Sequence, residues 1–449
     1  MIFRIACCGA LLVSLAFVVG AQEKPVAFTG ARILPITRPP IENGVLVVQG
    51  GKIVAIGAAG TVSISADAEI HDVAGKTLMP GLVDSHSHIG GWPSFGSDNS
   101  SPLQPEVRVL DALDVRDASV QKARAGGIVT VNVMPGSGHL ISGQTLYLKL
   151  RPGRTVEDML IPLPDGSPAG GLKMANGTNS IRQAQLANFP GTRAKSAALV
   201  REEFIKAREY RDKLARAGGD AEKTPARDLG LEELVEVLEG QRVVQHHTHR
   251  YDDILTVLRL QKEFGFKVVL HHISEGWKVA PEIAAAGAAC SVIVLDSPGG
   301  KIEARDARWK TGAVLEKAGV VVGFHTDDPI CDSRLFLRSA AFAVRGGMTR
   351  EGALAALTIN NAKILGLDDR TGSLEPGKDA DFIVLSGDPL SVYTRVEQTW
   401  VEGVKAFDFS DAQDRLWAVG GAGAGDPRRP FLCCFGSAWD LIATASAAR

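Results

Sequence analysis

The sequence is poor in cysteine, and no two of its six cysteines have the Cys-x-x-Cys spacing of a thiolate metal site. Cys7 and Cys8 lie in an apolar N-terminal stretch. The remaining thiols are read as structural, free or tail thiols rather than ligands. Their pairing is left open by the sequence, although export would permit disulfides. These four are Cys290, Cys331, Cys433 and Cys434.

An excess of charge of either sign is also missing. The 49 basic and 51 acidic residues give a net charge of -2, so nothing predicts binding to nucleic acid or to an anionic membrane surface. With 449 residues, 45% of them apolar, the chain is long enough for a large core and a second domain. We expect a globular protein that acts on a small-molecule substrate, with the oligomeric state open and a homo-oligomer included.

The N-terminus carries an apolar run, which residues 1–21 form. Arg4 supplies a cationic start, residues 5–20 are almost wholly apolar, and small residues precede Gln22, as in a cleavable signal peptide. The run is too short and wrongly flanked for a stable membrane span. We therefore expect a periplasmic or secreted protein. The alternative, an uncleaved anchor, lacks a positively charged flank after the run.

Short β-branched runs stand near both ends of the chain. Gly50-Gly51 separates two of them and is a hairpin signal. Because so small a sheet needs further strands, we expect residues 22–79 and 368–409 to build one composite β-sandwich. Residues 410–449, rich in Gly and Ala, are expected to be a low-complexity tail outside the function.

Between these segments, residues 80–367 alternate apolar runs with helical patterns, the order of βα units. Eight runs are found, which predicts an α/β fold with an eight-stranded (β/α)8 TIM-like barrel of parallel strands. Residues 192–241 are a charged helical insertion of open purpose. The eight runs are 82–83, 127–131, 145–148, 171–174, 242–245, 267–270, 290–295 and 320–324.

The first apolar run of the barrel leads into Asp84, His86 and His88. The histidines are two positions apart, so an extended strand projects both imidazoles from one face. Two converging neutral imidazoles are half of a metal site. Three later runs also end in histidine or aspartate, and the C-terminal ends of parallel barrel strands share one rim. The three later groups are residues 246–250, 271–272 and 325–328.

Only His71 and His139 of the ten histidines lie outside these groups. Histidines that merely satisfy hydrogen bonds in a core should be scattered, so the clustering predicts a metal site at the rim rather than a metal-free, histidine-rich one.

At this point the chain resembles the amidohydrolase superfamily, and more closely its branch related to imidazolonepropionase and to secreted prolidase-like members. The resemblance covers about residues 27–408. It implies a metal-dependent hydrolase on a distorted barrel with a flanking β-sandwich. The motifs that carry it are residues 80–88, 135–138, 143–144, 247–250, His272, Thr326-Asp327 and 372–382.

The resemblance implies that metal-site and catalytic residues are His86, His88, His247, His272 and Asp327. A divalent ion, with Zn²⁺ the first choice, would lower the pKa of a bound water toward neutrality. Asp327 would take the proton from that water and pass it to the leaving nitrogen. His272 would complete the metal shell or polarise the carbonyl oxygen.

The number of ions depends on Lys173, the lysine placed to bridge two ions if it is carboxylated. Near relatives carry Gly-Glu-Asn where this chain has Gly177-Thr178-Asn179. Threonine cannot replace a glutamate ligand, so we favour one ion, with two as the alternative.

Four residues around the site are candidate substrate contacts: His249, Arg250, Gln144 and His325. Arg250 has a competing use, a salt bridge to Asp252 or Glu275. His246 and His271 alternate to the opposite strand face and are expected to pack.

We therefore expect an exported hydrolase that adds water across a carbon–nitrogen bond of a cyclic or linear amide, with Asp327 as general base and acid. One alternative is a metallo-dipeptidase of the prolidase kind, which Arg250 would favour if it binds a peptide carboxylate. Another is a catalytically inactive periplasmic protein that binds a metal or ligand.

Overall fold

The computed structural model describes residues 24–91, 98–181, 188–293 and 302–420. The expected signal peptide, the adjacent pair Cys433 and Cys434, and the tail beyond residue 420 lie outside the described residues.

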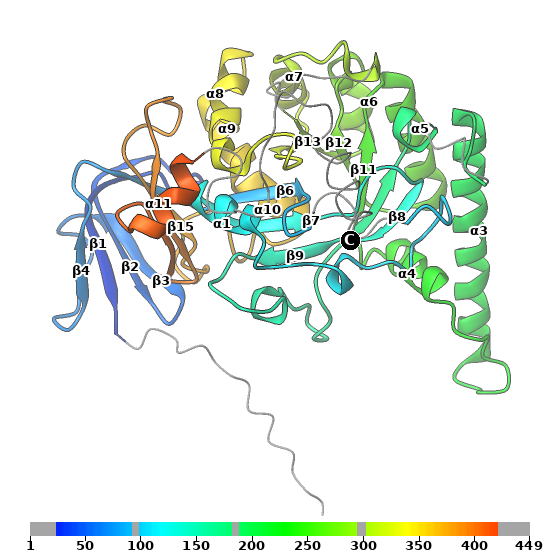
Figure 1. Ribbon diagram of the computed structural model, residues 1–449, viewed down its shortest axis with the longest axis horizontal. Helices are drawn as coiled ribbons and strands as arrows, with labels where there is room; N and C mark the ends of the chain where they lie inside the picture. Colours follow the sequence, from blue (N-terminus) through cyan, green and yellow to red (C-terminus); the bar gives the residue numbers. More distant parts are fainter. Residues whose placement is uncertain (1–23, 92–97, 182–187, 294–301, 421–449) are drawn as a thin grey trace, which may run out of the picture.

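Strands from both ends of the chain form one eight-stranded sheet, in the order β17-β16-β15-β5-β1-β2-β3 with β4 beside β1. Figure 1 shows the N-terminal and C-terminal strands side by side at one end of the molecule. This confirms the composite β-sandwich. The bounds are β1 (Val26–Ile33), β2 (Ile41–Gln49), β3 (Lys52–Ala58), β4 (Glu69–Asp72), β5 (Thr77–Pro80), β15 (Phe382–Leu385), β16 (Val396–Val401) and β17 (Val404–Asp408).

The predicted hairpin joins β2 to β3. Gly50 and Gly51 have φ of 58° and 77°, values that glycine adopts without a steric penalty. Inside this domain the rings of Phe28, Phe382 and Trp400 contact one another, with centroids 4.8 to 5.6 Å apart. The sandwich therefore has its own aromatic core.

The barrel is built from two sheets, β6-β7-β9 and β14-β13-β12-β11-β10-β8. Asn361 joins their end strands, because its side-chain amide donates to the carbonyl oxygens of Val83 at 2.5 Å and Phe324 at 2.6 Å. The bounds are β6 (Leu82–Ser87), β7 (Ile128–Val133), β8 (Ile141–Gln144), β9 (Leu146–Lys149), β10 (Leu172–Ala175), β11 (Val244–Thr248), β12 (Val268–His272), β13 (Ala289–Val292) and β14 (Val322–Phe324).

All eight predicted barrel strands are present, but the expectation that they are all parallel is wrong for one of them. β9 pairs antiparallel with β7, and the additional strand β8 pairs antiparallel with β10. The physical reason is that the connection between β7 and β9, residues 134–145, contains the strand β8 and no crossover helix. A parallel return needs a crossover of a dozen or more residues, usually helical.

Helices surround the barrel sheets, and the insertion forms α3 and α4 at one side of the domain (Figure 1). Val200, Phe204 and Ala207 are buried on α3. The bounds are α1 (Ala118–Ala125), α2 (Thr178–Ile181), α3 (Arg193–Ala217), α4 (Leu229–Leu238), α5 (Tyr251–Phe264), α6 (Ala280–Ala285), α7 (Thr311–Lys317), α8 (Arg338–Arg345), α9 (Arg350–Leu357), α10 (Ile359–Leu365) and α11 (Ala412–Val419).

Helix ends follow the capping residues of the sequence. Thr192 and Thr349 accept hydrogen bonds from backbone N–H groups in the first turns of α3 and α9, and Gly265 ends α5 in the left-handed conformation. The helix that begins after Thr349, α9, ends before Thr358, and α10 begins directly after it. One detail differs from expectation. The first residues of the expected tail form α11, which packs against α1.

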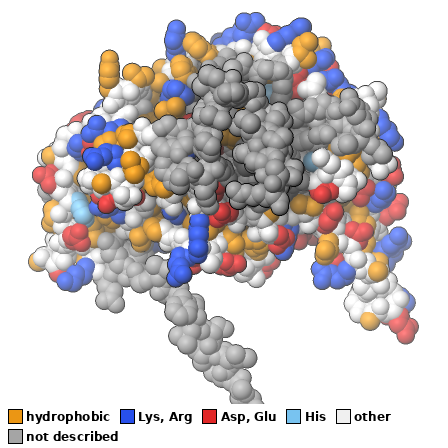
Figure 2. All heavy atoms as spheres, viewed as in Figure 1, with side chains coloured by type: hydrophobic (Ala, Val, Ile, Leu, Met, Phe, Trp, Pro, Cys, Tyr) orange, Lys and Arg blue, Asp and Glu red, His pale blue; other side chains and the backbone are white. Residues whose placement is uncertain are grey.

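Among the described residues, no helix is both long and apolar enough to cross a membrane. On the described part of the face in Figure 2, Lys and Arg side chains lie interspersed with Asp and Glu, in keeping with the net charge of -2.

Candidate metal centre

The ends of β6 and β14 bring together two histidines and a carboxylate. His86 is fully buried and His88 is 7% exposed. The Oδ1 atom of Asp327 lies 3.0 Å from His88 Nε2 and 3.4 Å from His86 Nε2. His88 is oriented by its other ring nitrogen, Nδ1, which lies 2.8 Å from the carbonyl oxygen of Met134. The side chains predicted from the first motif and the last rim group therefore meet at one point.

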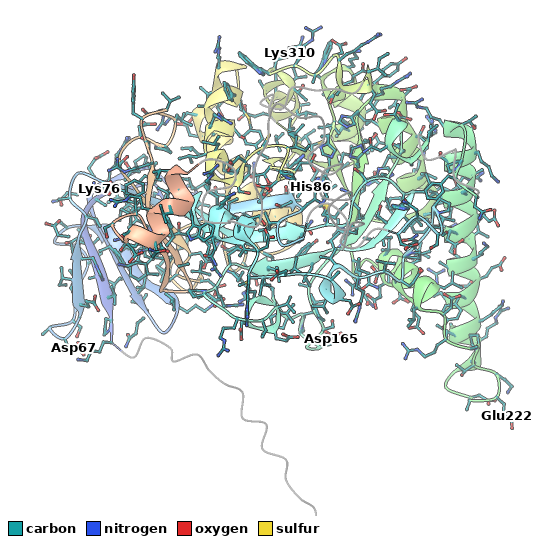
Figure 3. The ribbon with its side chains drawn as sticks, in the orientation of Figure 1. Asp67, Lys76, His86, Asp165, Glu222 and Lys310 are labelled. Carbon is teal, nitrogen blue, oxygen red and sulfur yellow. The ribbon has the colours of Figure 1, made fainter. Side chains whose placement is uncertain are left out.

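β11 and β12 add further imidazoles to this point. The ring centroids of His247 and His272 are 4.4 Å apart, and those of His86 and His272 are 5.0 Å apart. His86 lies inside the barrel domain in Figure 3. Among the described residues, three groups have ligand atoms within 4.8 Å of one another: His86, His271 and His325; His247, His249 and His272; and His86, His272 and Asp327.

The side chains of this cluster have the protonation states that metal ligands need. Burial, with smaller contributions from neighbouring charged groups, lowers the pKa of both His86 and His272 well below the ordinary histidine value. Burial alone would raise the pKa of Asp327, but the hydrogen bond and charge of His88 lower it below its ordinary value. Neutral imidazoles beside an ionised carboxylate are the donor set that Zn²⁺ and similar divalent ions take in proteins.

The backbone is strained where the cluster forms. His272 and Asp327 have φ of 67° and 52°, in the left-handed region that non-glycine residues rarely adopt. His272 is the last residue of β12, and Asp327 lies three residues after the end of β14. The strain turns their side chains toward the same interior, and such outliers concentrate at functional sites.

This turn of the backbone corrects the expectation for His271, which was expected to face away from the site. Its ring lies 5.0 Å from that of His86, the same separation as for His272. Strict alternation of side chains holds only while a strand stays extended, and the chain leaves the extended conformation at His272 and Ile273. His246, by contrast, packs as predicted, with Nδ1 3.0 Å from the carbonyl oxygen of His247.

His325 and His249 sit against the cluster rather than apart from it. His325 Nε2 lies 3.1 Å from His272 Nδ1, and its Nδ1 lies 2.7 Å from Ser291 Oγ. Burial lowers the pKa of His325 to about 3. His249 stacks on His272 at 5.0 Å and its Nδ1 lies 2.8 Å from Ser274 Oγ. His325 and His249, both predicted substrate contacts, are therefore also placed to orient the imidazole of His272.

Lys173 is fully buried at the same place. Its Nζ lies 3.0 Å from His86 Nε2 and 3.4 Å from Met134 Sδ. Thr178, at the position where the resemblance leads one to expect a glutamate, uses its backbone N–H to donate to Glu303 at 2.9 Å. The lysine therefore touches a predicted ligand, while the threonine makes a structural contact.

Two predicted substrate contacts have contacts other than the histidine cluster. Arg250 donates to Asp252 at 3.0 and 2.8 Å, which is the competing use that the sequence left open, and its side chain is 40% exposed. Gln144 pairs with Leu172 at the beginning of β10 and lines a different cavity. The prediction that Gln144 joins the metal centre is not supported by this placement.

Sequence reasoning missed Asp84. Its carboxylate accepts from Thr326 Oγ1 at 2.6 Å and from the backbone N–H of Thr326 and His86 at 3.1 and 3.2 Å. It thus fixes the end of β6 to the loop after β14. The period of two along the strand, which places Asp84 on the face of His86 and His88, was the signal that could have found it.

The comparisons with known proteins agree with this architecture. The model of the amidohydrolase family matches residues 77–406, so the chain belongs to the amidohydrolase family. It is a metal-dependent hydrolase of that superfamily by membership, with a TIM barrel and a β-sandwich.

Three relatives show how similar the chain is to known members of the family. An amidohydrolase from Thermotoga maritima MSB8 superposes with a TM-score of 0.80 at 36% identity, covering 85% of this chain and all of that one. An imidazolonepropionase from Rhizobium rhizogenes is 26% identical over 395 residues, 82% of this chain and 92% of the relative. Amidohydrolase tasK from Hapsidospora irregularis is 29% identical over 369 residues, 76% of this chain, and the match spans only 37% of that protein.

A prolidase complexed with N-methylphosphonate-L-proline shares the fold, with a TM-score of 0.52 at 19% identity over 85% of this chain and 99% of that one.

Proposed function

We propose that the protein adds water across a carbon–nitrogen bond of a cyclic or linear amide, in a reaction that needs a divalent cation at the histidine cluster. The observation that carries this proposal is the convergence of His86, His272 and Asp327, whose ligand atoms lie within 4.8 Å of one another. These residues come from three strand ends far apart in the sequence, at the face of the barrel where catalytic groups belong.

The ligands in this proposal are His86, His88, His247, His272 and Asp327. When bound, a divalent cation polarises a carbonyl oxygen and lowers the pKa of a coordinated water toward neutrality. Zn²⁺ is our first choice, since four nitrogens and a carboxylate suit it. We favour one ion. The group of His247, His249 and His272 offers a neighbouring position, so two ions remain the alternative, with Lys173, which contacts His86, as the candidate bridge.

Asp327 moves the proton in this proposal. Its pKa is lowered, so its carboxylate is ionised at neutral pH and can accept a proton from the attacking water. Its side chain is 17% exposed, so the proton can then pass to the leaving nitrogen of a bound substrate. His272 stays neutral because of its lowered pKa, and it orients the carboxylate or the substrate oxygen without carrying a charge.

The metallo-dipeptidase alternative has less support. It relied on Arg250 as the group that binds a peptide carboxylate, but this guanidinium is held by Asp252. The fold likeness to a prolidase does not choose between substrates. The alternative of a catalytically inactive binding protein has less support, because every expected metal-ligand position carries a histidine or an aspartate.

We also propose that the protein is exported from the cytoplasm. The apolar start of the chain, with Arg4 before it, supports a cleaved signal peptide and a periplasmic or secreted location. Detection of the mature N-terminus near Gln22 in protein recovered from the periplasm or medium would test it.

The experiment for the activity is a screen of cyclic amides, linear amides and dipeptides with zinc-loaded protein, followed by Asp327→Asn on the best substrate. We expect Asp327→Asn to lower kcat by about 10²- to 10⁴-fold. The matched control is Asp332→Asn, because Asp332 pairs with Arg334 at 2.5 Å and is not in the cluster. Equal activity of Asp327→Asn and wild type would remove the role of Asp327, and no turnover of any amide would support the binding protein.

A further inference from the structure

A second, separate cavity lies at the opposite ends of the barrel strands. It has a volume of about 520 Å³, within the range of small-molecule sites. Ser167 precedes β10 and Arg242 precedes β11, and both line the cavity, whereas His247 lies near the far end of β11. The rise of that strand separates the two sites by roughly 10 Å or more. In Figure 3, Asp165, next to Ser167, lies well away from His86.

Charges of both signs line this cavity. Its wall includes five acidic and three basic side chains. Some are satisfied by one another: Arg108 forms a two-point contact with Asp111 at 2.8 and 2.7 Å, and Arg227 does so with Glu232 at 2.8 and 2.7 Å. The acidic residues are Glu106, Asp111, Glu232, Glu233 and Glu236, and the basic ones are Arg108, Arg227 and Arg242.

Other polar groups of the wall are not satisfied within the described part of the chain. Glu106 is exposed to the cavity and makes no hydrogen bond or ion pair with any described residue. The side-chain amide of Gln144 makes only a 3.5 Å contact with the carbonyl oxygen of Pro105. Arg242 uses Nε for both Glu236 at 2.5 Å and Glu233 at 3.0 Å, so its terminal nitrogens donate to no described residue.

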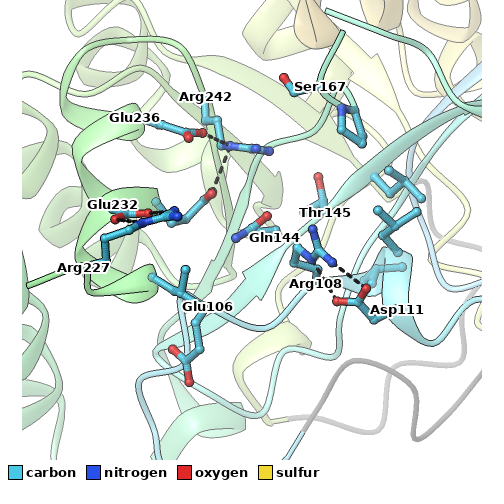
Figure 4. A pocket seen from close by; sticks show the side chains of 16 residues that line it. Glu106, Arg108, Asp111, Gln144, Thr145, Ser167, Arg227, Glu232, Glu236 and Arg242 are labelled. Carbon is cyan, nitrogen blue, oxygen red and sulfur yellow. Dashed lines mark hydrogen bonds and ion pairs between the residues drawn. The ribbon is translucent and has the colours of Figure 1, made fainter. Parts of the chain in front are cut away.

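Figure 4 shows how these groups face one another. Arg242 and Arg108 stand on facing walls with Gln144 and Thr145 between them, and Glu106 lies on a third side. Glu233 forms part of the wall behind Arg242, with a side chain only 2% exposed. Burial raises the pKa of Glu233 to about 8 although Arg242 opposes this, so at neutral pH Glu233 is mostly protonated and does not neutralise the charge of Arg242.

We propose that this cavity binds a free α-amino acid in its zwitterionic form. The α-carboxylate is received by the terminal nitrogens of Arg242 and by Nη1 of Arg108, the terminal nitrogen that does not contact Asp111. The α-ammonium is received by the carboxylate of Glu106, and the amide of Gln144 lies between them. An anion alone would face a wall with a net excess of carboxylates, and a cation alone would leave the terminal nitrogens of Arg242 and Nη1 of Arg108 without an acceptor. The site lies on the face of the barrel that does not carry the catalytic loops, so this proposal does not depend on the proposed function.

Isothermal titration of the metal-loaded full chain with L-alanine tests it. We expect a Kd of about 1 mM or lower, with acetate and methylamine, which each carry one of the two charges, binding at least 10-fold more weakly. Arg108→Gln and Glu106→Gln should each weaken L-alanine binding by about 10-fold or more. Arg201→Gln is the matched control, because Arg201 pairs with Glu263 at 2.9 Å outside this cavity and should leave binding unchanged.

An amino acid can also bind a metal, so the same titration is run on His86→Ala. Unchanged affinity in His86→Ala places the ligand in the second cavity. Lost affinity in His86→Ala, equal affinity in Arg108→Gln and wild type, equal binding of acetate or methylamine, or no heat up to about 10 mM L-alanine would each overturn the proposal. Amide hydrolysis measured in parallel reports on the proposed function alone.

Discussion

Among the residues that the structure describes, Lys149 and Lys173 are at most 1% exposed, and their surroundings differ. Lys149, in β9, lies between Asp379 at 2.9 Å and Asp381. Lys173, in β10, lies against the imidazole of His86 and the thioether of Met134. The first lysine is compensated by carboxylates at the junction of barrel and sandwich. The second contacts a residue that is itself a metal-ligand candidate, and in such surroundings a charge serves the chemistry rather than the fold.

The neighbourhood of Lys149 extends the contrast. Lys52 contacts Asp379 at 2.6 Å, Arg370 contacts it at 3.2 Å, and Arg151 pairs with Glu402 at 2.5 Å. Cations and anions alternate across this junction. In the histidine cluster, by contrast, several groups of one type face one another with Asp327 as the carboxylate among them. The donor atoms of the cluster would bind an added cation, whereas the carboxylates of the junction are already paired with lysine and arginine side chains.

The largest effect that tests this comparison is expected from Lys149→Met. The substitution leaves Asp379 and Asp381 buried without their shared cation, so we expect the free energy of unfolding to fall by about 3–5 kcal/mol. Urea unfolding measures this. Metal content per folded molecule should stay that of the wild type. A loss below about 1 kcal/mol would mean that the junction does not depend on Lys149.

The matched substitution, Lys173→Met, should lower metal affinity rather than stability. We expect metal affinity to fall by about 10- to 100-fold, as for groups that orient metal ligands, while the free energy of unfolding changes much less than in Lys149→Met. Competition with a chromogenic chelator measures the affinity. If the two variants lose the same stability and keep the same metal affinity, the distinction between the two lysines is wrong.

Acid titration sharpens the junction side of the comparison. Burial alone would raise the pKa of Asp379, but Lys149, Lys52 and Arg370 lower it to about 2. A lowered folded-state pKa means that the stabilisation is present above about pH 4 and is lost as the pH falls through about 2. We expect Asp379 to contribute roughly 2 kcal/mol to this loss. In Asp379→Asn the free energy of unfolding should fall less steeply between those pH values, and an identical slope would contradict the assignment.

The smallest effect is expected at an exposed ion pair. Arg250 and Asp252 are 40% and 39% exposed, and such pairs stabilise by about 0.5 kcal/mol. Arg250→Gln should therefore change the free energy of unfolding by no more than this and leave kcat and KM for an amide nearly unchanged. A large rise of KM for dipeptides alone would revive Arg250 as the contact of a peptide carboxylate.

The sequence predicted the parts of this architecture that repeat. Apolar runs followed by histidine or aspartate located the strands and their common rim, because the period of a strand and the shared edge of parallel strands are regular. It did not predict the antiparallel β8 and β9, since an apolar run carries no direction. It misplaced His271, because a single residue with positive φ, His272, ends the alternation on which the prediction relied.

The sequence also did not predict contacts between polar residues that lie far apart along the chain. Lys149 gave no signal in the sequence, because Asp379 and Asp381 lie more than 200 residues further along the chain. The carboxylate of Asp84 and the ion pair of Arg250 likewise depend on which polar groups the fold brings near. Gln144 shows the same limit, since its neighbours in the second cavity come from α4 and from the segment before β11.

The central claim is that buried histidines and Asp327 hold a divalent cation on which hydrolysis depends. The most direct measurement is the metal content of purified wild type and His86→Ala by plasma mass spectrometry, with amide turnover recorded on the same samples. We predict about one ion per wild-type chain, and in folded His86→Ala both little metal and little turnover. Equal metal content in the two proteins, or full turnover by metal-free protein, would contradict it.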